Sequence, residues 1–117
     1  MRGIAQYKKS RVESASQQQI LVLLVRTAVQ KLYEVEDVLD QPSELTPRLH
    51  HVRAIFLELR QALDHELAPE LCSNLSRVYG WIIRETLSVP SEPERLEPLV
   101  QVVESLLVSW ETAVNEA

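Results

Sequence analysis

Residues 14–25 read SASQQQILVLLV, a polar start followed by six consecutive apolar residues. Ser16 and Gln19 have the spacing of a capping box, in which the serine hydroxyl accepts from the N3 amide and the glutamine reaches back to the N-cap amide. We therefore expect a helix to begin at about residue 17. Apolar residues at spacings of three and four continue this helix to about residue 40, and Pro42 follows its end.

The first helix carries two apolar stripes. One consists of Leu21, Leu24, Ala28, Leu32, Val35 and Leu39, and the other of Val22, Val25, Val29 and Tyr33. The two stripes lie roughly 100° apart around the helix. A helix that contacts several neighbours in a bundle must be apolar most of the way round. The valine stripe adds more apolar area than a compact four-helix bundle is expected to cover, which makes it a candidate binding surface.

Three more amphipathic helices are predicted. Thr46 and Pro47 indicate the start of a second helix that ends near residue 67. Pro69 opens a third helix that ends at about residue 89, and the regular part of a fourth begins at about Arg95. No segment alternates with period two for long enough to be a strand.

Four amphipathic helices with short connections predict an all-α fold, an antiparallel four-helix bundle. We place this single domain at residues 16–117. Residues 1–15 are polar and have no clear helical period. We expect them to form a flexible N-terminal arm or a short extra helix, with Tyr7 as its large aromatic residue.

Composition excludes several classes of protein. The net charge of -5, with basic residues scattered among acids, disfavours a nucleic-acid-binding surface. Cys72 is the single cysteine and cannot form an internal disulfide bond. The longest apolar run, residues 20–25, is far below the roughly 20 residues that span a bilayer. The N-terminus does not resemble a secretory signal. We therefore expect a cytoplasmic protein that neither inserts into a membrane nor binds nucleic acid.

The sequence offers no catalytic constellation. Metal sites in helical bundles commonly use Glu-x-x-His pairs, but Pro47, Arg48 and Ala62 stand three residues before the three histidines His50, His51 and His65. We expect no metal, no cofactor and no enzymatic activity, and we expect Cys72 to be a buried small apolar residue. A histidine phosphotransfer bundle is an alternative, although the small residue and lysine that usually follow its histidine are missing.

Three segments in order resemble the FliS family of flagellar secretion chaperones. The first comprises Tyr7, Val12, residues 14–17, Gln19-Ile20 and Leu23-Leu24, and the second comprises Asn74-Leu75, residues 78–82 and Arg84. The third comprises Val103, Leu106, Leu107, Trp110 and Ala113. The family usually continues its first apolar run with Leu-Tyr-Asp-Gly-Ala, whereas residues 24–28 here read LVRTA, so the resemblance is to a divergent member.

The resemblance implies a chaperone without enzymatic activity. Such a protein binds the disordered C-terminal segment of flagellin in the cytoplasm, prevents its premature polymerisation and presents it to a component of the flagellar type III export gate. We expect the client to contact Tyr7, Ile20, Val22, Val25, Val29, Leu75, Tyr79, Trp81, Ile83, Leu107 and Trp110. We expect the arm to cover part of this groove when no client is bound. The alternative from the residues alone is a helical adaptor, in which the extra stripes close a homodimer.

Overall fold

A computed structural model describes the backbone of residues 2–116 and the side chains of residues 17–115. Four α-helices and one 3₁₀ turn follow one another along the chain: α1 (Arg2–Asp37), α2 (Pro42–Gln61), α3 (Pro69–Ser88), η1 (Pro93–Arg95) and α4 (Leu96–Glu116). Residues 2–116 contain no strand. The prediction of an all-α four-helix bundle is confirmed.

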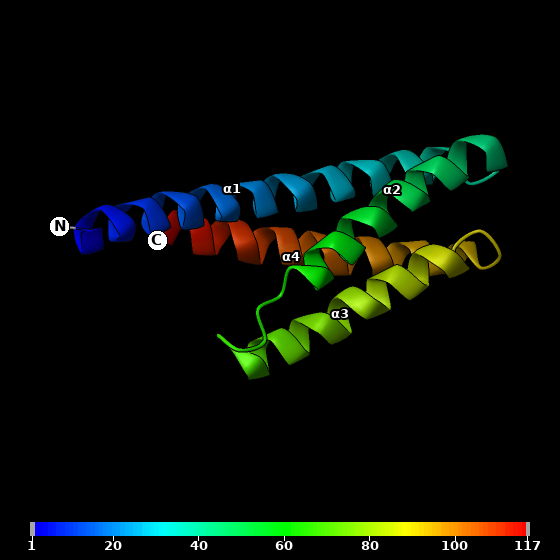
Figure 1. The fold of residues 1–117 in the computed structure, drawn as a ribbon. Helices are drawn as coiled ribbons and strands as arrows, with labels where there is room; N and C mark the ends of the chain where they lie inside the picture. The colour runs from blue at the N-terminus through cyan, green and yellow to red at the C-terminus, as the bar shows by residue number, and fades with distance from the viewer. Residues whose placement is uncertain (1, 117) are drawn as a thin grey trace.

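Successive helices run antiparallel, and the molecule is elongated, with extents of 60 × 24 × 23 Å (Figure 1). α1 packs along both α4 and α2, and α2 packs along α3. Contacts between α3 and α4 are few. The two helices meet near their connection, and α3 diverges from α4 toward its own N-terminus (Figure 1). The bundle is therefore closed between α1 and α4, between α1 and α2, and between α2 and α3, and it is partly open between α3 and α4.

The first helix begins earlier than the sequence predicts. α1 is continuous from Arg2, so Ser16 and Gln19 lie inside the helix and do not cap its start. Residues 4–37 contain neither glycine nor proline, the two residues that most strongly interrupt a helix. The side chain of Tyr7 lies outside the described residues. The domain boundary at residue 16 and the flexibility of the arm stay predictions.

Both predicted ends of the second helix are wrong. α2 begins at Pro42, which suits the first helical position because its missing amide hydrogen is not needed there. Pro47 is consequently inside the helix. At the other end, the Asp64 carboxylate accepts hydrogen bonds from the backbone N–H groups of Glu66 (3.1 Å) and Leu67 (3.3 Å). This Asx turn lies in the connection between Gln61 and the start of α3 at Pro69, so residues 64–67 do not continue the helix.

Both predicted ends of the third helix and the predicted start of the fourth are confirmed within one residue. α3 begins at Pro69 and ends at Ser88. α4 begins at Leu96, so Pro98 falls in its first turn, where amide hydrogens have no intrahelical partner.

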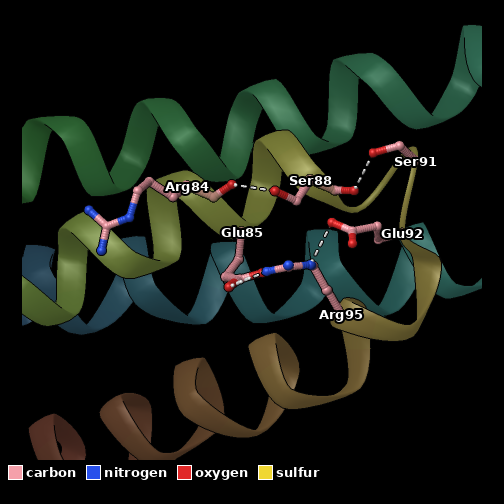
Figure 2. Close-up of polar contacts among 6 residues, drawn as sticks. All are labelled: Arg84, Glu85, Ser88, Ser91, Glu92 and Arg95. Atoms are coloured by element: carbon pink, nitrogen blue, oxygen red, sulfur yellow. Dashed lines mark hydrogen bonds and ion pairs between the residues drawn. The ribbon is translucent and has the colours of Figure 1, made fainter.

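Charged side chains join α3 to α4 at their connection (Figure 2). Arg95 Nη1 lies 3.1 Å from both carboxylate oxygens of Glu85, which is 8% exposed. Arg95 Nε lies 2.7 Å from the carboxylate of Glu92. One guanidinium thus holds the end of α3, the η1 turn and the start of α4 together.

The valine stripe of α1 belongs to the hydrophobic core. Val22, Val25 and Val29 are 8%, 0% and 6% exposed, so the expectation that a compact bundle leaves this stripe uncovered is wrong. α1 contacts both α2 and α4, and the two stripes together match this pair of neighbours. Tyr33, the last residue of the stripe, is 46% exposed, and the other large apolar side chains that α1 exposes within residues 17–37 are Ile20 and Leu23.

We predict that Val25→Asp destabilises the protein strongly, whereas Leu23→Asp does not. An unpaired carboxylate at the fully buried position should lower the free energy of unfolding by about 3–5 kcal/mol. The same change at Leu23, which is 58% exposed, should alter it by less than about 0.5 kcal/mol. Urea denaturation followed by circular dichroism measures both values. Equal stability of the two variants would contradict the packing of α1 described above.

Candidate functional site

An apolar cleft lies at the end of the bundle where α2 stops. α2 ends at Gln61 and α3 begins at Pro69, while α1 and α4 continue beyond them (Figure 1). The cleft has a volume of about 460 Å³. Its lining comes from all four helices and the turn after α2: Gln17, Gln18, Ile20, Leu21, Leu24, Glu58, Leu59, Ala62, Leu63, Leu75, Tyr79 and Trp110.

Tyr79 is the deepest aromatic residue of the cleft. Its side chain is 1% exposed, and its ring packs at a tilt against Phe56, with 5.6 Å between the ring centroids. Burial raises the pKa of Tyr79 to about 12, and the nearby Trp110 indole N–H opposes part of this rise. The phenol is therefore neutral at physiological pH.

Trp110 brings an unpaired polar group to this site. Its indole nitrogen Nε1 is buried and, although it lies near the Tyr79 phenol, it reaches hydrogen-bond geometry with no acceptor in the described part of the chain. The contact with the Tyr79 phenol does not meet hydrogen-bond geometry, so the indole N–H is able to donate to a better-placed acceptor on a bound molecule.

The walls of the cleft expose apolar surface. Ile20 is 55% exposed, while Leu21, Leu24 and Leu75 are half-buried. Glu58 carries the one charged side chain among the described residues of the lining. A largely apolar surface with a polar rim is typical of a site that binds another apolar element.

The structure brings four of the predicted site residues together: Ile20, Leu75, Tyr79 and Trp110 line the cleft. Three others, Val22, Val25 and Val29, are buried in the core. Trp81, Ile83 and Leu107 are half-buried, pack against the core and do not line the cleft. The side chain of Tyr7 is not among those described.

Sequence reasoning missed several residues of the cleft, among them Leu59, Ala62 and Leu63 of α2 and the turn after it. The spacing of these apolar residues predicts only that they belong to the hydrophobic core, as in any amphipathic helix. A signal in this region is Asp64, whose side chain favours a turn and so indicates that the chain is no longer helical by residues 64–67. With α2 ending at Gln61, α1 and α4 continue beyond it.

The histidines and the cysteine lie outside the cleft. His50, His51 and His65 are exposed, and Cys72 is buried with its thiol donating to the Asp64 carbonyl over 3.3 Å. Within the described residues, no three histidine, cysteine, aspartate or glutamate side chains form a group that could hold a metal ion. In the same part of the chain, no helix combines the length and the hydrophobicity that crossing a bilayer requires.

Comparison with known proteins identifies a family. A family model described as "Flagellar protein FliS" matches residues 1–117 of the chain. None of the curated proteins matches it.

We predict that the stability of the protein falls between pH 10 and pH 12 because of Tyr79. The pKa of its phenol is raised to about 12 from an unfolded value near 10, so the folded state favours the neutral form. This contribution is complete below pH 10 and is lost as the pH rises through 12, a change of about 2–3 kcal/mol.

Urea denaturation across this pH range measures the loss. The control is Tyr79→Phe, which keeps the ring but has no proton to lose, and its pH dependence should be smaller by that amount. Identical pH profiles for the two proteins would show that Tyr79 is not buried as described.

Proposed function

We propose the function of this chain from its family, because the chain belongs to the FliS family, whose members are flagellar export chaperones for flagellin. In our proposal it acts in the cytoplasm, binds the disordered C-terminal segment of flagellin, prevents premature polymerisation and delivers the segment to the flagellar type III export apparatus. The observation that carries the proposal is the apolar cleft at the open end of the bundle. Binding of this kind requires no catalytic residue.

The shape and chemistry of the cleft support a helical client. A segment that forms helices in a filament presents apolar residues at i, i+3, i+4 and i+7, and such a face fits a hydrophobic groove between helices. Ile20, Leu75 and Tyr79 line such a groove from α1 and α3. A disordered client would fold as it binds, which lowers the net affinity and favours later release.

Trp110 supports a client with a hydrogen-bond acceptor at its buried face. The last turn of a helix has carbonyl groups without intrahelical partners, and one of them would pair with the indole N–H. A neutral acceptor is favoured over a carboxylate, because Glu58 lies in the same lining and the protein has a net charge of -5.

The client-contact residues named from the sequence therefore divide into two groups in this proposal. Ile20, Leu75 and Trp110 contact the client directly, and Tyr79, which is 1% exposed, forms the floor of the cleft beneath it. The buried valines of α1 belong to the core, and Trp81, Ile83 and Leu107 pack against it, so these residues act through the fold and do not touch the client. Tyr7 and the arm cover the cleft when no client is bound, which requires residues 2–15, helical here, to bend away from the axis of α1.

We predict that Ile20→Glu weakens binding of the flagellin C-terminal segment by at least about tenfold, or about 1.4 kcal/mol. Ile20 is 55% exposed, so the substitution should leave the fold intact while placing a charge on the apolar wall of the cleft. Calorimetry with the C-terminal segment of flagellin from the same organism, and with its N-terminal segment as a control ligand, measures the affinity. The wild-type protein should bind with 1:1 stoichiometry and a negative heat-capacity change.

The matched control is Val108→Glu, which places the same charge at a position of α4 that is 63% exposed and outside the cleft. It should bind as the wild type does. No binding by the wild type would refute the proposed function and favour the homodimeric adaptor. Equal weakening by both variants would place the client elsewhere on the molecule.

A further inference from the structure

The arginines of the protein fall into two groups. Within residues 17–115, three of them form ion pairs with carboxylates: Arg26 with Glu111, Arg48 with Glu34 and Glu44, and Arg95 with Glu85 and Glu92. The other four, Arg53, Arg60, Arg77 and Arg84, all lie on α2 and α3 and have no carboxylate partner among the described side chains. Their charge is unpaired within this part of the protein.

Two of these arginines converge over one glycine. A Cβ atom at Gly80 would lie 3.4 Å from Nη1 of Arg60 and 3.4 Å from Nη1 of Arg84, so the two guanidinium groups lie close together above the α3 backbone. Arg60 Nε donates to the Ser76 hydroxyl at 3.0 Å, which fixes one of the two groups across the gap between α2 and α3. Two like charges that lie close together repel each other, and an anion between them would relieve this repulsion.

The carboxylates of α2 and α3 do not neutralise these arginines. Glu44 pairs with Arg48, and Glu85 pairs with Arg95. Glu58 lines the cleft, and Glu70 lines a hollow at the start of α3. Figure 2 shows the guanidinium of Arg84 pointing away from Glu85, its neighbour in sequence. The cations over Gly80 are therefore available to an acidic partner.

Exposed leucines flank the arginines. Leu57, which is 42% exposed, lies three residues before Arg60 and four after Arg53, so it shares their face of α2. Leu87, which is 59% exposed, lies three residues after Arg84 on α3. The face thus combines exposed apolar side chains with cations. We define it as the α2–α3 face: Arg53, Leu57, Arg60, Gly80, Arg84 and Leu87.

We propose that the α2–α3 face docks an acidic amphipathic helix of a partner protein. The two leucines would pack against the partner's apolar stripe, and its carboxylates would lie between Arg60 and Arg84, forming charge-assisted hydrogen bonds. The charge of this face is opposite to the net charge of the protein, -5, so it steers acidic partners to one place on the surface.

The α2–α3 face is distinct from the client cleft, because none of its six defining residues belongs to the cleft lining. The client cleft and the α2–α3 face therefore share no residue. The inference does not depend on the proposed function, since it rests on the charges of α2 and α3.

The test uses the full chain and a fluorescent synthetic peptide with leucine at helical spacings of three and four and glutamate at the remaining positions. Fluorescence anisotropy measures its binding at low and at physiological ionic strength, and circular dichroism checks that each variant is folded. The double variant Arg60→Gln/Arg84→Gln should bind at least about tenfold more weakly than the wild type. Leu57→Ser/Leu87→Ser should also weaken binding.

The matched control is Arg26→Gln/Arg48→Gln, which removes the same charge from arginines that have carboxylate partners, and it should change the affinity by less than about twofold. Failure of the wild type to bind the peptide would overturn the proposal, as would equal weakening by the control. Equally tight binding of a single-stranded oligonucleotide, unaffected by the leucine substitutions, would also overturn it in favour of a general anion-binding surface.

Discussion

Two hydrogen bonds to the Asp64 carboxylate stabilise the turn that follows α2 at the open end of the bundle. The carboxylate accepts from the backbone N–H groups of Glu66 and Leu67, and the resulting turn lies between Gln61 and Pro69. α1 and α4 run on without α2 beside them (Figure 1). Their apolar side chains, which a longer α2 would cover, form walls of the cleft instead.

The protein keeps its unpaired arginines apart from its apolar cleft. The carboxylate of Glu85 is used within the fold, where it joins α3 to α4 through Arg95. Arg60 and Arg84, in contrast, gather over Gly80 without a carboxylate partner among the described side chains. Because the residues of the α2–α3 face do not line the cleft, one small bundle offers a largely apolar site and a basic site in different places.

Prolines and apolar spacing are enough to predict the number of helices and most of the bounds of α3 and α4, because Pro69, Pro90 and Pro98 act locally. The same signals predict the start of α1 wrongly. The sequence before Ser16 has no glycine or proline after Gly3, and the helix begins at Arg2 instead of at the capping signal. These signals also fail at the end of α2, because apolar spacing continues through the turn that Asp64 makes.

The candidate site is less predictable than the fold. Periodicity shows which residues of α1 share a face, but not how many helices pack on that face, so the buried valine stripe looks like a binding surface from the sequence alone. The four predicted site residues that do share the cleft, Ile20, Leu75, Tyr79 and Trp110, come from three helices. Periodicity within one helix cannot bring them together, and their grouping came from the family resemblance.

Trp110 gives the protein an optical reporter at its candidate binding site. Of the two tryptophans, Trp110 lines the cleft, while Trp81 packs against the core outside it. Indole emission depends on the polarity and hydrogen bonding around the ring. Occupation of the cleft can therefore be followed without an attached dye, and the signal comes from a single emitter once Trp81 is replaced by phenylalanine.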